Sequence, residues 1–124
     1  LLEDPGNTGR AAIAHVFAEG FNEEINGVIA GVMPWGPDVL VTVYPDLWRL
    51  RDTDGDGRAD RQESQFRGFG VHAAFDGHDL HGLIMGPDGK IYFSNGDNGF
   101  SVTTREGRRL HHPNTGGILR MDPD

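Results

Sequence analysis

The sequence contains no cysteine. Disulfide bonds, thiolate zinc sites, cysteine nucleophiles and a covalently attached c-type haem are therefore excluded from this chain. Basic side chains are also scarce, because 11 Lys and Arg stand against 19 Asp and Glu, and the formal net charge is −8. A chain of this charge repels phosphate, so we expect no nucleic-acid partner.

Long apolar runs are missing as well. A helix that crosses a bilayer needs about 18 or more consecutive apolar residues. The longest apolar stretches, Val28–Trp35 and Val39–Tyr44, have half that length or less, so we expect no transmembrane segment. The chain opens with neither Met nor a basic-then-apolar signal peptide, which fits a mature product or an excised segment.

Glycine and proline are abundant, at 19 and 7 of the 124 residues, or about a fifth of the chain. Average usage is about 12%, and low-complexity disordered chains lie above about 25–30%. Apolar residues make up only 36%, but they occur in clusters. The composition therefore predicts an ordered, turn-rich domain.

The chain contains internal repeats, which are typical of stacked units. Gly36-Pro37-Asp38 precedes the run Val39–Val43, and Gly86-Pro87-Asp88 precedes the run Ile91–Ser94. Each pattern predicts a tight turn followed by a strand. A longer match has an offset of 48, and a third partial copy closes the chain. The matching segments are 2–11 with 50–59, Val16–Gly20 with Gln65–Phe69, and 118–122 with 47–52.

A period near 50 residues, built from short strands and Gly/Pro turns, is typical of β-propeller blades. Helical repeats need amphipathic runs of about ten or more residues, which the sequence lacks, whereas another all-β fold stays open. We expect one partial propeller domain over residues 1–124, with approximate repeats 1–50 and 51–122. These make about two and a half blades, and closed propellers have about 4–8. The chain is then a segment of a longer protein, or copies of it close the ring.

An acidic loop at residues 52–63 fits the calcium-binding pattern D-x-D-x-D-G-x5-E at every defined position. Calcium prefers six to eight oxygen ligands, and alternate aspartates direct their carboxylates to one centre. A solvated acidic turn is the alternative. The flanks do not suit the helices of an EF-hand, because Pro45–Leu50 predicts a turn and a strand and Gln65–Gly70 is aromatic and Gly-rich. The first copy has Gly6 and Thr8 in place of two aspartates, which predicts a weak site or none. The candidate ligands are Asp52, Asp54, Asp56, Arg58 through its carbonyl, Asp60 and Glu63.

Three histidines lie close together in the sequence, at His72, His78 and His81. Their spacing fits no standard zinc finger, and a solvated or capping role is the default for each. His78 precedes an apolar strand, and Asp97 follows its predicted hairpin partner. Because the start of one hairpin strand lies beside the end of the other, the two side chains can meet. A carboxylate at one ring nitrogen would leave the other to act as a general base, unless Asp97 only caps a Gly-rich turn.

The remaining aromatic residues are expected to fill the blade cores, and the polar stretch Thr103–Thr115 is expected to form a surface loop before a strand at Gly117–Met121. The core candidates are Trp35, Trp48, Phe66, Phe69, Phe75 and Phe93.

Residues 78–97 resemble the catalytic hairpin of the pyrroloquinoline-quinone-dependent sugar dehydrogenases, the glucose/sorbosone dehydrogenase superfamily. The shared pattern is a histidine (His78), seven residues, a G-P-D-G turn (Gly86–Gly89), an Ile-Tyr strand and then Gly96-Asp97. The whole chain, including Asp52–Glu63 and Gly116–Pro123, looks still more like the membrane-bound-dehydrogenase-like or haem-binding propeller proteins of planctomycetes and related bacteria.

The resemblance implies a six-bladed propeller, of which this chain is a part, located in the periplasm or outside the cell. It implies that His78 takes the hydroxyl proton of a sugar or alcohol, that Asp97 supports His78, and that hydride passes to pyrroloquinoline quinone. The quinone-clamping residues belong to later blades, and a cytochrome is an expected electron acceptor. The rival interpretation is a non-catalytic, calcium-stabilised propeller that scaffolds electron-transfer or binding partners.

Overall fold

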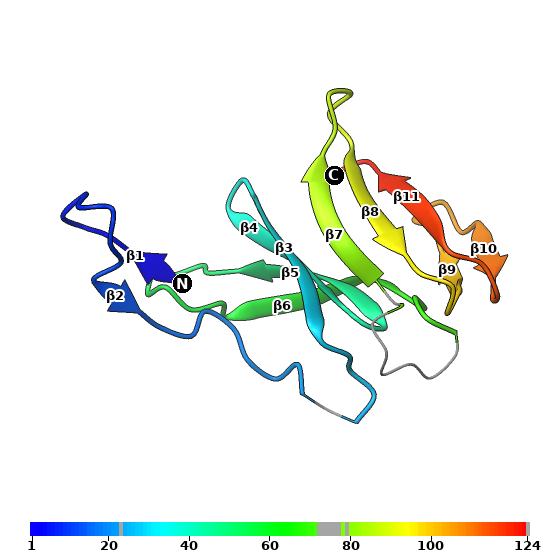
Figure 1. Ribbon diagram of the computed structural model, residues 1–124, viewed down its shortest axis with the longest axis horizontal. Coiled ribbons are helices and arrows are strands. Elements are labelled where there is room, and N and C mark those ends of the chain that lie inside the picture. The colour runs from blue at the N-terminus through cyan, green and yellow to red at the C-terminus, as the bar shows by residue number, and fades with distance from the viewer. Residues whose placement is uncertain (23, 72–77, 79, 124) are drawn as a thin grey trace.

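The computed structural model describes residues 1–22, 24–71, 78 and 80–123, and every regular element in these ranges is a β-strand (Figure 1). The predicted all-β class is therefore confirmed. The described part of the chain has no helix that could cross a membrane. The strands are β1 (Leu2–Glu3), β2 (Ile13–Ala14), β3 (Ile29–Trp35), β4 (Asp38–Val43), β5 (Asp46–Arg51), β6 (Arg61–Arg67), β7 (Leu80–Met85), β8 (Ile91–Asn95), β9 (Phe100–Thr103), β10 (Arg109–His112) and β11 (Gly117–Met121).

The first large sheet contains β3, β4, β5 and β6, each antiparallel to the next and in sequence order. The inner strand β4 is buried along almost its whole length, as its β-branched sequence predicts. A four-stranded antiparallel sheet of this kind is the unit from which propeller blades are built. The expected repeat boundary, between residues 50 and 51, falls at the end of β5 and therefore inside this sheet.

The second large sheet has the order β11-β8-β7, so β8 is its central strand. β11 spans Gly117–Met121, as the sequence predicts. The chain between β8 and β11 forms a separate hairpin of β9 and β10, in which Val102 and Leu110 are cross-strand partners. The prediction that Thr103–Thr115 forms a surface loop is therefore wrong. A single apolar residue, Leu110, among polar neighbours gave no alternation that would indicate the strand β10.

The two sheets pack against each other through β7, which lies against β3 and β4 (Figure 1). Their backbones approach closely at two glycines. A Cβ atom on Gly31 would lie 3.0 Å from the carbonyl carbon of Gly82, so a side chain at this crossing would force the sheets apart. Phe69 and Phe93 are buried in the adjoining core, as expected, whereas Phe75 lies outside the described residues. The buried members of this core are Leu47, Phe69, Leu80, Phe93, Phe100 and Val102.

A second core forms on the opposite face of the first sheet, where the segment after β2 covers β4 and β5. Phe17 and Phe21 pack there beside Trp48. The Phe21 and Trp48 rings meet edge to face, with centroids 5.6 Å apart. The same segment holds the acidic loop, because the Ala59 N–H donates to the Phe17 carbonyl over 2.7 Å. The N-terminal segment therefore links the first sheet to the loop between β5 and β6.

Candidate functional site

His78 and Asp97 meet at one end of the second sheet. His78 lies just before β7 and Asp97 just after β8, and the register pairs Leu80 with Asn95 beside them. The Nδ1 atom of His78 lies 2.8 Å from Oδ1 of Asp97. Both side chains are accessible, with 60% and 73% of their surface exposed. The hairpin thus brings together the two residues that the sequence pairs.

The loop that carries Asp97 is held by Asn95, which sequence reasoning did not single out, and by Gly96, which belongs to the Gly-Asp element of the shared pattern. The buried side chain of Asn95 donates from Nδ2 to the carbonyls of Gly96 and Gly99, at 2.9 Å each. Gly96 lies directly against the His78 backbone, since a Cβ atom there would be 2.2 Å from the His78 carbonyl oxygen. The run Asn95-Gly96-Asp97-Asn98-Gly99 was the available signal, because Asn and Gly favour tight turns.

The geometry of this pair suits proton transfer. When Asp97 accepts the Nδ1 proton, the lone pair of a neutral imidazole is on Nε2, the nitrogen that a general base would use. The carboxylate also fixes the ring orientation. Of the other two histidines, His81 lies on β7 and His72 lies outside the described residues. Among these three histidines, His78 is therefore the one that the described residues place beside Asp97.

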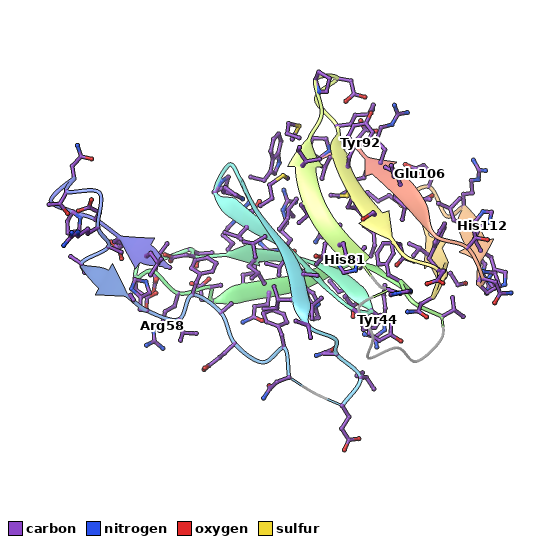
Figure 2. All side chains as sticks on the ribbon, in the orientation of Figure 1. Tyr44, Arg58, His81, Tyr92, Glu106 and His112 are labelled. Atoms are coloured by element: carbon purple, nitrogen blue, oxygen red, sulfur yellow. The ribbon has the colours of Figure 1, made fainter. Side chains whose placement is uncertain are left out.

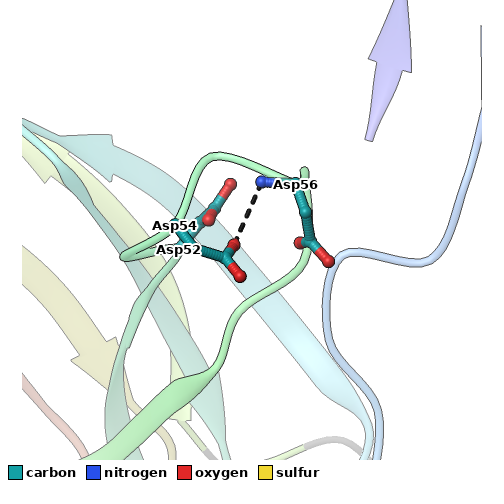
Figure 3. Close-up of side chains that lie close together, drawn as sticks. All are labelled: Asp52, Asp54 and Asp56. Carbon is teal, nitrogen blue, oxygen red and sulfur yellow. Dashed lines mark hydrogen bonds between the residues drawn. The ribbon is translucent and has the colours of Figure 1, made fainter.

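Three carboxylates of the acidic loop lie close together between β5 and β6 (Figure 3). Asp52, Asp54 and Asp56 each offer an oxygen, and these oxygens all lie within 4.8 Å of one another. Asp52 also accepts the N–H groups of Gly55 at 2.7 Å and Gly57 at 2.8 Å. These hydrogen bonds lower the pKa of Asp52, and the bond from Gly57 has the largest effect. A hydrogen-bonded carboxylate keeps lone pairs for a cation, so the three aspartates have the donor chemistry that calcium prefers.

Two of the other predicted calcium ligands, Asp60 and Glu63, have different partners. Asp60 binds Thr53 instead, through a hydroxyl hydrogen bond of 2.5 Å. Glu63 lies on β6 and pairs with Arg61, whose Nη2 is 2.6 Å away. Arg58 follows Gly57 and donates its N–H to Asp56 over 2.8 Å. In this conformation the loop presents three carboxylates, and Glu63 would have to leave Arg61 to close a site around them.

Glu63 instead faces a charged cluster on the first sheet. The buried carboxylate of Asp38 accepts a bidentate pair of hydrogen bonds from Arg51, at 2.5 and 2.8 Å, and Nε of Arg49 lies 2.8 Å away. The Arg51 hydrogen bond lowers the pKa of Asp38, and the charge of Arg49 adds to the effect. A small cavity of about 80 Å³ is bounded by these three residues with Arg61 and Glu63.

The first copy of the acidic loop shares one backbone hydrogen bond of the aspartate with the second copy. Asp4 accepts the Gly9 N–H over 2.7 Å, as Asp52 accepts the Gly57 N–H. Thr8, at the position of Asp56, donates its hydroxyl to Asp4 over 3.2 Å. The first copy therefore keeps the loop shape with one carboxylate where the second has three.

The acidic loop and the histidine pair are separate sites. Figure 2 shows Arg58 of the loop far from His81, which lies on β7 close to the position of His78. The His78–Asp97 pair and the acidic loop therefore occupy different parts of the molecule.

Comparison with known proteins identifies one relationship. No curated protein and no solved structure matches the chain. A family model described as "Domain of unknown function (DUF7133)" matches residues 1–124. The chain therefore belongs to the DUF7133 family.

Proposed function

We propose that this chain supplies the general base of a quinone-dependent sugar or alcohol dehydrogenase with a propeller fold. The observation that supports the proposal is the 2.8 Å contact between His78 Nδ1 and Asp97 Oδ1 at an accessible end of the sheet. The resemblance of residues 78–97 to the catalytic hairpin of quinone-dependent sugar dehydrogenases supplies the reaction type. The enzyme acts in the periplasm or outside the cell, where a cytochrome accepts the electrons.

In this proposal His78 Nε2 takes the proton of the substrate hydroxyl, and Asp97 stabilises the imidazolium that forms. Pyrroloquinoline quinone, when bound, supplies the acceptor for the hydride of the carbinol carbon, and the product is a carbonyl or lactone. The buried Asn95 and the closely packed Gly96 keep the two side chains in place during the transfer. The pair fits the proton-accepting half of the reaction, while the residues that clamp the quinone belong to other blades.

Calcium has a structural part in the same proposal. Asp52, Asp54 and Asp56 would hold the ion and tie β5 to β6, because their carboxylates repel one another without a cation. The three aspartates are remote from His78, so removal of a bound ion would weaken the fold without changing the His78–Asp97 pair.

The test is dye-linked oxidation of a panel of aldoses and alcohols by the intact protein, reconstituted with calcium and the quinone. His78→Ala should lower turnover by about 10²–10⁴-fold, the usual contribution of a general base. His81→Ala, three residues along, is the matched control and should keep most of the activity. Absence of quinone-dependent turnover in folded, calcium-loaded protein would favour a non-catalytic scaffold that binds electron-transfer partners.

A further inference from the structure

We propose that the cavity beneath the β9–β10 hairpin binds a small planar aromatic compound of about the size of indole. The cavity has a volume of about 250 Å³ and lies between the inner faces of β8 and β11 and the hairpin. Its floor is apolar, and four phenylalanines contribute to it: Phe66, Phe69, Phe93 and Phe100.

The repeat in the sequence identifies the residue at the equivalent position of the first sheet. β5 pairs with β4 so that Trp48 lies beside Val41, and β11 pairs with β8 so that Leu119 lies beside Phe93. Residues 118–122 also match residues 47–52 in sequence. Leu119 is therefore the counterpart of Trp48.

The residues that cover the two positions correspond as well. Phe17 and Phe21 precede the first sheet and pack beside Trp48. Phe66 and Phe69 precede the second sheet and pack in the core that includes Leu119. The pair beside Trp48 comes from the segment before β3, and the pair near Leu119 comes from β6 (Phe66) and the segment after it (Phe69).

In the first sheet an indole ring occupies the space between these layers. Trp48 contacts Phe21 edge to face, with ring centroids 5.6 Å apart. In the second sheet the corresponding side chain is a leucine. Phe93 is larger than Val41 and packs against Phe69 at 5.7 Å, yet the cavity remains beside Leu119. The void therefore has the surroundings in which this chain elsewhere holds an indole.

The size and the lining of the cavity agree with such an occupant. An apolar protein cavity of about 150 Å³ holds benzene, so a cavity of 250 Å³ has room for a two-ring compound. Aromatic rings gain edge-to-face contacts with the phenylalanines beyond simple burial. Trp48 Nε1 is buried with no hydrogen-bond partner among the described residues. Recognition therefore rests on ring shape, and benzofuran, which has no N–H, should bind as indole does.

The mouth of the cavity limits the polar groups that the compound can carry. Arg105 and Arg120 line it together with Glu106 and Asp122, so charges of both signs are present. The guanidinium of Arg105 stacks 5.5 Å from the centre of the Phe66 ring, and Figure 2 shows Glu106 close to β11. A neutral ring compound suits these balanced charges best.

The experiment titrates indole and benzofuran into the intact protein while methyl NMR signals of Leu119 and Met121 are recorded. We expect saturable shifts with dissociation constants of about 0.1–1 mM, typical of ligands this small. Leu119→Trp fills the cavity with an indole of the chain's own, and should raise the melting temperature and weaken binding at least about tenfold. Ile118→Trp, at the neighbouring position that is 80% exposed, should change neither.

A complementary variant keeps the test decisive if Leu119→Trp folds poorly. Trp48→Leu should open an equivalent cavity in the first sheet and bind a second equivalent of indole, which restores part of the lost melting temperature. The proposal is overturned if neither ring compound binds at millimolar concentration. It is also overturned if indole binds the Leu119→Trp protein as tightly as the original one.

Discussion

Asn7 and Gly55, which lie 48 residues apart, share a left-handed backbone conformation, with φ of 49° and 82°. Each follows an aspartate by three residues, and that aspartate accepts a backbone N–H from five residues further along. The sequence repeat between residues 2–11 and 50–59 is thus also a repeat of backbone conformation. Its two copies differ in their carboxylates, and only the second has a triad of aspartates.

Replacement of Asn7 tests this geometry. Asn7→Ala should lower the free energy of unfolding by about 1 kcal/mol, because a Cβ without a compensating polar group disfavours positive φ. Asn7→Gly should be neutral or slightly stabilising. Denaturant unfolding measures both, and hydrogen exchange of residues 1–15 shows whether the loss is local. Equal effects of Ala and Gly would contradict the assigned conformation.

Asp97→Asn tests the supporting carboxylate under the proposed function. The variant keeps the size of the side chain but removes the charge that stabilises the imidazolium, so kcat should fall by about 10–100-fold. KM should change little, because Asp97 positions His78 and does not itself touch substrate. Steady-state kinetics on the intact protein separates the two parameters. A rise in KM with unchanged kcat would assign Asp97 to substrate binding instead.

Gly96→Ala tests the positioning of the pair without altering either charge. The added Cβ would lie 2.2 Å from the His78 carbonyl oxygen, so the His78 backbone must shift. We expect turnover to fall at least tenfold, since displacements of about 1 Å can cost 10²-fold. Gly117→Ala is the matched control, because the nearest atom to its Cβ would be 4.0 Å away, on Phe100. Full activity in Gly96→Ala would show that the close packing has no functional role.

Asp54→Ala tests the proposal that the acidic loop binds calcium. Calcium at about 100 times its dissociation constant stabilises a site by about 2.7 kcal/mol, so the variant should have a lower melting temperature in calcium but not in chelator. Glu63→Gln should respond equally in both conditions, because Glu63 pairs with Arg61 away from the aspartates. A calcium-specific loss in Glu63→Gln would show that the whole 12-residue pattern acts as the ligand set. An equal loss for Asp54→Ala in both conditions would exclude calcium binding.

Asp38 gives the fold a defined acid sensitivity. Arg51 lowers the pKa of Asp38 below its ordinary value of 3.8 in the folded chain. Its stabilising contribution is therefore complete above pH 3.8 and is lost as the pH falls through the lower, folded-state pKa. Asp38→Asn should cost about 1–3 kcal/mol at pH 7 and flatten the acid limb of the stability curve.

The matched control for this change is Glu19→Gln on an exposed segment, which should alter stability by less than about 0.5 kcal/mol. Urea unfolding between pH 2.5 and 7 distinguishes the two variants. If Asp38→Asn unfolds with the acid dependence of the unmodified protein, another carboxylate carries that sensitivity.

The sequence by itself determined the two strands that follow the Gly-Pro-Asp turns, whereas it missed β10. The runs after Gly36-Pro37-Asp38 and Gly86-Pro87-Asp88 became β4 and β8, because β-branched and aromatic residues after a tight turn favour extended backbone. The approach of His78 to Asp97 could also be predicted, because hairpin connectivity alone places the start of one strand beside the end of the next.

Only the tertiary structure decided which side chains meet across separate elements. Glu63 completes a calcium pattern in the sequence, but its place on β6 puts it beside Arg61. Asn95 and Gly96 looked like ordinary turn residues until their contacts with the loop and with His78 were known. The space beside Leu119 depends on segments far apart in the chain. Local propensity follows from neighbours in sequence, whereas ion pairing and cavities depend on packing distances that no short pattern encodes.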